Sequence, residues 1–374
     1  MLTLDKVYHA SYVLKEIVRR TDLIPAPDLN PASQLYLKPE NLQVTGSFKV
    51  RGAYYKMSLL SPEEQERGVI ACSAGNHAQG VALAAQRRNI HATICLPDGA
   101  PISKVEATRR YGAEICLVPG VYDDAYQRAL QLRDEYGYTF IHPFNDEDVI
   151  AGQGSIGLEL LDQLSDVEAV IVPVGGGGLI SGVAFAIKAL NPNCKVYGVQ
   201  ASGAPSMFNS VHEGHAEALS SVSTFADGIA VKCPGDLSYA LCSQYVDDIV
   251  TVTDDEISTA ILTLIEHHKL IAEGAGAVSV AAAMFNKVPI QGKKTICLIS
   301  GGNIDVNILS RVITRGLVMS GRKANLTIAL EDKPGQLQQV ADIVSRCGSN
   351  VVSVLHDGSD PNMPISSCFL KLTL

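Results

Sequence analysis

The sequence predicts an α/β protein whose parallel sheets are covered by helices on both faces. From residue 69 onward, short apolar runs alternate with longer segments of helical apolar spacing. Alternation of this kind favours parallel strands, because each crossover helix has to lie on a face of the sheet. With 374 residues, 47% of them hydrophobic and 18% charged, the chain has the composition of an ordinary soluble protein with two or three domains.

The first 68 residues lead into this alternation. Residues 7–20 have apolar positions near helical spacing and predict a helix, and residues 23–25 and 35–40 predict strand and turn pieces. Residues 47–59 predict a second helix. Ser61-Pro62-Glu63-Glu64 predicts a helix start, since proline stands at the first helical position with acids behind it.

Two α/β series follow. In the first, the predicted strands are 69–72, 92–96, 114–118 and 138–141, and the predicted helices are 75–88, 103–111 and 122–136. In the second, the predicted strands are 169–174, 195–200, 247–252 and 295–300, and the predicted helices are 157–164, 179–190, 254–269 and 276–285. Residues 201–231 are less regular. Residues 320–323 read as a linker, followed by predicted strands at 324–330, 350–355 and 366–374 and a helix at 335–347.

Composition and charge exclude several classes of function. The formal net charge of −9, without runs of Lys or Arg, argues against nucleic acid as a partner. The uncharged stretch 169–187 is broken by Pro173 and four glycines, so we interpret it as a buried strand, turn and helix rather than a membrane span. The first 30 residues lack the shape of a signal peptide, and the nine cysteines show no metal-ligand spacing. These features favour reduced thiols and a cytoplasmic location.

Lys49 is the first candidate for chemistry. It lies in Thr45-Gly46-Ser47-Phe48-Lys49-Val50-Arg51-Gly52-Ala53, among small and apolar residues just before a predicted helix. Partial burial lowers the pKa of a lysine and leaves a reactive amine. The alternative is a solvated surface lysine at a helix start, which is the usual place for lysine.

Three loops after strand ends are further candidates, and each also has a purely structural interpretation. Gly175 to Gly178 precede a helix and offer bare N–H groups to an anion, or simply form a tight turn. The loop Ser73 to Gly80 could hold a carboxylate, although Ser73 and Asn76 are also good N-caps. Ser300-Gly301-Gly302-Asn303 lies at the carboxyl edge of the sheet, where ligands of α/β proteins bind, or forms a turn. A dinucleotide fingerprint and a P-loop are both missing from the sequence, which disfavours a nicotinamide dehydrogenase.

Taken together, residues 47–53, 73–80, 175–179 and 300–303 closely resemble the threonine dehydratase family. These are fold-type II (tryptophan synthase β-like) enzymes that depend on pyridoxal 5'-phosphate (PLP), and the resemblance covers about residues 1 to 320. It implies two parallel α/β domains. The large PLP-binding domain would consist of residues 1–52 and 153–321, and the small α/β domain of residues 53–152.

The resemblance also implies roles for individual residues. The implied catalytic residues are Lys49, which holds the cofactor covalently, Ser73 and Glu273. The other implied cofactor contacts are Phe48, Asn76, Gly175, Gly176, Gly177, Gly178, Leu179, Gly228 and Ser300. The implied ligands of the substrate carboxylate are Ser73, Ala74, Gly75, Asn76 and His77. For Glu273, an ordinary surface acid is an equally good interpretation.

These roles imply a β-elimination. A serine hydroxyl opposite the pyridine nitrogen is a weak acid, so the ring is a weaker electron sink and early loss of a β-substituent is favoured. We expect Lys49 to take the α-proton of L-threonine, giving 2-oxobutanoate and ammonia, and L-serine to give pyruvate. The alternatives are a serine racemase or another PLP β-eliminase on the same fold, and a catalytically silent amino-acid-binding regulator.

Two departures from related families sharpen the hypothesis. Serine racemases need a second acid/base residue, a serine, at the position that is Ala74 here, so we expect poor racemisation. Their divalent metal site needs acids after the strand at 196–199, where this chain reads Gln200-Ala201-Ser202-Gly203-Ala204-Pro205-Ser206, so we expect no strong divalent site there, although backbone carbonyls could hold a monovalent ion. The family resemblance also implies a homodimer or homotetramer.

The tail, residues 322–374, resembles part of an ACT regulatory domain. Leu326 to Leu330, the turn Asp332-Lys333-Pro334-Gly335 and the following helix match the opening of that α+β module. Its usual order is βαββαβ, whereas residues 325–374 leave room only for βαββ, so a sheet edge should stay unpaired and apolar. The resemblance implies an amino-acid or nucleotide effector. The alternative is a small lobe without a ligand.

Overall fold

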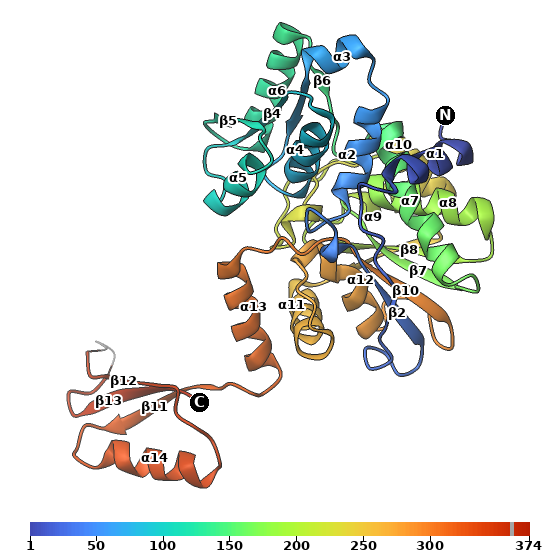
Figure 1. Cartoon of the computed structure of the whole chain (residues 1–374). Helices are drawn as coiled ribbons and strands as arrows, with labels where there is room; N and C mark the ends of the chain where they lie inside the picture. The colour runs from blue at the N-terminus through green and yellow to red at the C-terminus, as the bar shows by residue number, and fades with distance from the viewer. Residues whose placement is uncertain (360–362) are drawn as a thin grey trace. The chain divides into compact units, whose positions relative to one another are not determined.

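The computed structural model describes residues 1–359 and 363–374, and the chain forms two compact units, Met1–Asp305 and Val306–Leu374 (Figure 1). The further division of the first unit into a large and a small domain stays a prediction. The α/β fold class is confirmed, with one mixed and one parallel sheet in the first unit.

The first unit contains two sheets with helices packed on them (Figure 1). The larger has the strand order β1-β2-β10-β7-β8-β9, in which β1 and β2 are antiparallel and all other pairs are parallel. Its strands are β1 (Ile24–Pro25), β2 (Gln34–Pro39), β7 (Ala169–Pro173), β8 (Lys195–Ala201), β9 (Asp248–Val252) and β10 (Lys294–Ile299). The smaller sheet is parallel and has the order β5-β4-β3-β6, made of β3 (Val69–Cys72), β4 (Ala92–Pro97), β5 (Glu114–Val118) and β6 (Thr139–Phe140).

The helices of the first unit connect these strands. Those around the smaller sheet are α2 (Lys49–Ser58), α3 (Pro62–Arg67), α4 (Asn76–Arg88), α5 (Ile102–Arg109) and α6 (Tyr122–Tyr136). The others are α1 (Leu4–Leu14), α7 (Glu147–Gln163), α8 (Gly178–Leu190), α9 (Ser206–Glu213), α10 (Asp236–Tyr245), α11 (Asp254–Thr263) and α12 (Gly274–Met284). Short turns of 3-10 helix occur at η1 (Glu40–Leu42) and η2 (Asp227–Ile229), and a π-helix, η3 (Leu264–His268), continues α11.

Two helices begin with the capping residues that favour a helix N-terminus. Ser61 caps α3 through a reciprocal pair of hydrogen bonds with Glu64, and proline occupies the first helical position, as predicted. Thr253 and Glu256 form the same capping box at α11. Burial of β7 and β10 explains why β7 reads as an uninterrupted apolar run and why β10 is apolar from Ile296 to Ile299.

The predicted helix 157–164 is much too short, because α7 begins ten residues earlier. Gly152, Gly154 and Gly157 lower the helix propensity of this stretch. In the structure they allow close packing: a Cβ on Gly152 would lie 2.6 Å from the Cα atom of Gly52 in α2, and one on Gly157 would lie 2.9 Å from Ala186 in α8. Tertiary packing therefore outweighs local propensity here. At the other end of the chain, the predicted helix 7–20 is too long, since α1 ends at Leu14.

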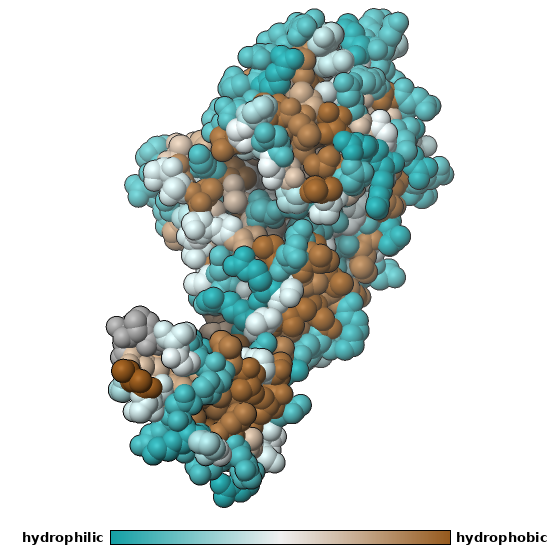
Figure 2. All heavy atoms as spheres, turned by 90° about the vertical axis from the view of Figure 1, so that its left-hand side faces the viewer, coloured by the Kyte–Doolittle hydropathy of each residue, from teal (hydrophilic) through white to brown (hydrophobic). Residues whose placement is uncertain are grey.

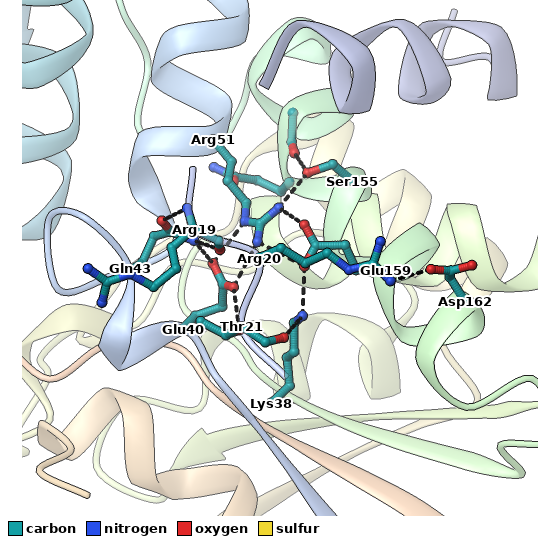
Figure 3. Close-up of polar contacts among 12 residues, drawn as sticks. Arg19, Arg20, Thr21, Lys38, Glu40, Gln43, Arg51, Ser155, Glu159 and Asp162 are labelled. Carbon is teal, nitrogen blue, oxygen red and sulfur yellow. Dashed lines mark hydrogen bonds and ion pairs between the residues drawn. The ribbon is translucent and has the colours of Figure 1, made fainter. Parts of the chain in front are cut away.

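A buried ion-pair network fixes the beginning of α2 (Figure 3). The Arg51 guanidinium donates two hydrogen bonds to Glu40, two to Glu159 and one to Ser155, so that all five N–H groups are used. Lys38 joins the network through Glu159 at 2.6 Å. Arg51, Glu40 and Lys38 have no exposed side-chain surface, and their opposite charges compensate one another. The network ties β2, η1, α2 and α7 together.

The second unit contains helix α13 (Val306–Met319), which the sequence analysis missed, and a small α+β layer. Its antiparallel sheet has the order β11-β13-β12, formed by β11 (Asn325–Glu331), β13 (Ser367–Thr373) and β12 (Ser353–Asp357), with α14 (Gln336–Arg346) after β11. The core is small and consists of Val340, Val344, Leu370 and Leu372. Figure 2 shows apolar side chains gathered on this unit, where Leu326, Val354 and Leu355 are exposed.

Two expectations about the whole chain can be compared with the structure. Among the residues it describes, no helix is long and apolar enough to cross a membrane. All nine cysteines are free thiols, and most of them are buried.

Candidate active site

The predicted loops meet at the carboxyl ends of the strands, with Lys49 among them. Lys49 opens α2, and the preceding residue, Phe48, donates its backbone N–H to the carbonyl of Ser300 at 3.2 Å. Ser47 forms an isolated antiparallel bridge with Gly301. The lysine loop is therefore held by its own backbone against the residues that follow β10.

The Lys49 amine has a neutral partner. Its Nζ donates to the carbonyl oxygen of Pro143 at 2.7 Å and lies 5.3 Å from the centre of the Phe48 ring. Burial lowers the pKa of Lys49 to about 8, and the nearby Glu273 carboxylate only partly opposes this shift. About a tenth of the amine is thus unprotonated at pH 7, far more than for an ordinary lysine, and this is the form that a nucleophile and base requires.

Buried Glu273 and half-buried Asn76 form a polar pair beside this amine. The Asn76 amide donates to Glu273 Oε1 at 2.5 Å and accepts from the Asn303 amide at 2.8 Å. Burial, followed by the nearby Asp227 carboxylate, raises the pKa of Glu273 to about 7. Glu273 is only 4% exposed, so the interpretation of it as an ordinary surface acid is wrong.

Two glycines, Gly301 and Gly228, leave room for the side chains around Glu273 and Asn76. A Cβ on Gly301 would lie 2.3 Å from Glu273 Oε1, and a Cβ on Gly228 would lie 2.9 Å from the Ala275 side chain. Ser300 is 3% exposed, and its hydroxyl donates to the Ala275 carbonyl at 3.3 Å. The structure thus brings Ser300 and Gly228 to the same group of residues as Glu273.

The glycine-rich turn after β7 is an anion cradle with free donors. In the part of the chain that the structure describes, no hydrogen bond uses the N–H groups of Gly175, Gly176 or Gly177, and Gly178 opens α8. Gly177 has a φ of 97°, and a Cβ there would lie 2.5 Å from the Met207 side chain. Unpaired N–H groups at a helix N-terminus bind phosphate well. Leu179, the second residue of α8, is buried.

The loop Ser73 to His77 joins β3 to α4. Ser73 Oγ accepts from the N–H of Gly75 at 3.1 Å, and Gly75 occupies the N-cap position without a side-chain cap. Ser73 and Asn76 therefore do not act as the N-caps that their residue types suggest. Ala74 and Gly75 are half-buried. The His77 ring donates through Nε2 to the carbonyl of Ile141 at 2.8 Å, so that only its backbone N–H is available to the loop. Burial, and then Lys49, lowers the pKa of His77 to about 3.

The sequence analysis missed the loop His142 to Asn145. The Pro143 carbonyl holds Lys49, whereas the Phe144 ring packs 2.5 Å from the position of a Cβ on Gly176. His142 Nδ1 accepts the N–H groups of Phe144 and Asn145, and burial lowers the pKa of His142 to about 4, which keeps the ring neutral. This loop links the amine to the anion cradle. Its only sequence signal is that it follows the end of β6.

Comparisons with known proteins agree with this geometry. The family model described as pyridoxal-phosphate dependent enzyme matches residues 14–302. An L-threonine ammonia-lyase of Thermotoga maritima is 52% identical over 376 aligned positions, covering 100% of this chain and 94% of the relative. The structure of the processed form of threonine deaminase isoform 2 from Solanum lycopersicum superposes with a TM-score of 0.79 at 41% identity, covering 83% of this chain and 93% of that chain. A maize serine racemase structure has a TM-score of 0.80 at 34% identity, covering 86% of this chain and 99% of that chain. The matched region includes every loop of the site, and the chain belongs to the family of pyridoxal-phosphate dependent enzymes.

Proposed function

We propose that this chain is a PLP-dependent threonine ammonia-lyase, which converts L-threonine to 2-oxobutanoate and ammonia and L-serine to pyruvate and ammonia. The observation that carries the proposal is the Lys49 amine, held by a carbonyl, with its pKa lowered to about 8. The identity of 52% with a threonine ammonia-lyase along the whole chain supports the same activity.

The residues present suit PLP. Unpaired N–H groups at Gly175 to Gly177, next to the N-terminus of α8, would hold the phosphate. The Lys49 amine would hold the cofactor covalently, Phe48 would pack on the ring and Asn76 would donate to its phenolic oxygen. Ser300 would face the pyridine nitrogen, and Gly228 would line the ring. Bound in this way, PLP supplies the electron sink that makes the α-proton of an amino acid acidic.

The remaining steps are assigned to this chain's own groups. Lys49 takes the α-proton, which its lowered pKa permits near neutral pH. The backbone N–H groups of Ser73 to His77 orient the substrate carboxylate at the start of α4. The Ser73 hydroxyl and Glu273 lie on the reacting side, and Glu273 fixes the Asn76 amide through the bond of 2.5 Å. The protonated Lys49 then gives this proton to the β-hydroxyl, which leaves as water, and the unsaturated product takes up water to give the 2-oxo acid and ammonia.

The test is release of 2-oxo acid from L-threonine and from L-serine by the purified protein, with Lys49→Ala as the control. We expect release with both substrates and none with Lys49→Ala. If the protein binds PLP that borohydride can reduce but releases no 2-oxo acid, the fold assignment stands and the proposed function is wrong. A colourless protein that binds amino acids without turnover would instead support the regulator alternative.

Serine racemase is the second candidate, because the maize enzyme has the same fold at 34% identity. Racemisation needs a proton donor on the opposite face of the substrate, and Ala74 has no acidic or basic group to supply it. We therefore propose elimination as the main reaction. Formation of D-serine from L-serine at a rate comparable with pyruvate release would reverse this choice.

The second unit supports a proposal of regulation. Its order β11-α14-β12-β13 corresponds to the βαββ part of an ACT-like domain, and α14 packs on one face of the sheet through Val340 and Val344. We propose that it binds an amino-acid or nucleotide effector, with isoleucine and valine as the first amino acids to try. A rise in melting temperature on their addition is the expected result, and a flat titration contradicts it.

Assembly, location and metal use are further proposals. We infer a cytoplasmic location, which the free thiols support. We also infer a homodimer or homotetramer, which the family to which the chain belongs supports. Analytical ultracentrifugation of the purified protein tests the assembly. The segment Gln200 to Ser206, whose first two residues end β8, lacks a carboxylate, so we propose that activity does not need a divalent cation there. A large loss of rate on chelation that magnesium or calcium restores would contradict this.

A further inference from the structure

A cluster of three metal-ligand side chains lies in the second unit, outside the proposed active site. It consists of Asp332, His356 and Cys368, whose ligand atoms all lie within 4.8 Å of one another. The Asp332 carboxylate is 3.3 Å from His356 Nε2. No step of the proposed elimination uses these residues.

The fold brings the three residues together from three separate segments. Asp332 follows the end of β11, His356 lies on β12 and Cys368 lies on β13. Leu370 is the register partner of His356, and Cys368 lies two residues before Leu370 on the same strand. Because residues two apart on a strand share a face, Cys368 and His356 lie on the face that carries the small core. The N–H of Asp332 bonds the carbonyl of Ser366, which holds the turn next to β13.

The three residue types indicate which metal ions the cluster could bind. A thiol, an imidazole and a carboxylate together are the ligand set of zinc and its first-row neighbours, whereas magnesium and calcium take oxygen ligands. Zinc bonds of about 2.0–2.3 Å place tetrahedral ligands about 3.3–3.8 Å apart. The cluster has to contract by about 1 Å, which the exposed side chains of Asp332 and His356 can do by rotation. A nucleophilic triad is excluded, because Cys368 is only 2% exposed and a substrate could not reach its sulfur.

We propose that Asp332, His356 and Cys368 bind one zinc ion that fastens the end of β11 to β12 and β13. The three side chains occupy three positions of a tetrahedron, and a water molecule takes the fourth. Binding removes the proton from the Cys368 thiol and transfers it to solvent.

A metal ion at this place would stabilise a unit that has a small core. The second unit spans residues 306–374 and has a core cluster of only four buried residues. Units of this size bury too little apolar surface for high stability, and a structural metal is a common supplement. A zinc ion would join all three strands of the sheet at one end, next to the turn that leads into α14.

The first experiment measures zinc in the full-length chain, produced without an affinity tag. The protein is incubated with zinc, passed over a gel-filtration column and analysed for metal. We expect one zinc per chain, and weakening of zinc binding by at least about 100-fold in Cys368→Ser, since loss of even an outer-shell partner costs 10–100-fold. Cys347→Ser is the matched control, because Cys347 is an exposed free thiol of the same unit.

Cobalt provides a second readout that does not depend on activity. In the parent chain and in Cys347→Ser, Co²⁺ should give a thiolate-to-metal charge-transfer band, and His356→Ala should weaken it. His356 is 54% exposed, so this substitution places little demand on folding. Failure to retain stoichiometric zinc, or a cobalt band that survives in Cys368→Ser, would overturn the proposal. Loss of the band in Cys347→Ser would equally overturn it, by assigning the binding to another thiol.

Discussion

Replacing Arg51 by methionine removes the centre of the buried ion-pair network in Figure 3. Methionine has similar length but no donor, so five hydrogen bonds disappear at once. Glu40, which has no exposed side-chain surface, then keeps only two long bonds from neutral donors, at 3.4 and 3.5 Å. Glu159 keeps its ion pair with Lys38. The substitution therefore leaves one carboxylate buried without a hydrogen-bonded cation.

The expected loss of stability follows from the unpaired negative charge that is left buried on Glu40. Removing one partner of a buried ion pair costs about 3–5 kcal/mol, because the other charge stays desolvated. Arg20→Met is a matched control, since Arg20 pairs with Asp162 at the surface and the two side chains are 58% and 65% exposed. Surface pairs contribute only about 0–1 kcal/mol. The two variants should therefore differ by at least about 2 kcal/mol in free energy of unfolding.

The assay is urea unfolding of the PLP-loaded chain, followed by circular dichroism, with the midpoint compared at equal m-value. Glu40→Gln combined with Arg51→Met should recover part of the loss, because it removes the unpaired charge; residues in one network typically couple by about 0.5–3 kcal/mol. If Arg51→Met and Arg20→Met unfold at the same urea concentration, the network does not stabilise the fold and the reasoning is wrong.

Three further predictions concern the proposed site. Lys49→Ala should lower 2-oxo acid release from L-threonine by at least about 10²-fold, as expected for loss of a positioned proton carrier, and a rate near that of the parent would contradict its role. Burial raises the pKa of Glu273 to about 7, so its carboxylate gains charge as pH rises through that value. The kcat/KM profile should rise through the same range in the parent, and Glu273→Gln should lack this inflection; two identical profiles would refute the assignment. Gly177→Ala should destabilise the chain by about 1–3 kcal/mol, from strain and a clash with Met207. Gly214→Ala, at a φ of 76° with nothing within 4 Å, should show only the strain, and equal melting temperatures for the two variants would count against the clash.

The strands of the first unit could be predicted closely, whereas several helices could not. Buried parallel strands leave a plain signal, because both faces are covered and the run is largely apolar, as in β7 and in residues 296–299 of β10. Helix α7 leaves a weak signal, since its glycines were selected by contacts with α2 and α8 rather than by helix propensity. Such contacts depend on partners far away in the sequence.

The same distinction applies to the site. Gly177 and Ser300 lie in loops, and Lys49 and Asn76 lie at the helix starts that follow loops, within short motifs whose residue types carry the chemistry, so motifs could locate them. Pro143 was not predictable, because it acts through a backbone carbonyl, and any residue type provides one. The pKa of a side chain is equally hidden in the sequence, since it depends on what the fold places next to it.

The lysines of α2 show how the fold decides which amine becomes reactive. Lys56 is partly buried, yet hydrogen bonds and charge from Asp146 and Asp148 outweigh desolvation and raise its pKa. Among the residues that the structure describes, the Pro143 carbonyl is the only hydrogen-bond partner of Lys49, so desolvation prevails and its pKa falls to about 8. Two residues further along the helix, on another side, Arg51 engages both nearby carboxylates of the network. Arg51 holds Glu40 and Glu159 in the core and keeps the helix in place, whereas the carboxylate that acts on Lys49 is Glu273, which raises its pKa only in part. The stability of α2 and the reactivity of Lys49 therefore depend on two different sets of carboxylates, which the fold keeps on different sides of the helix.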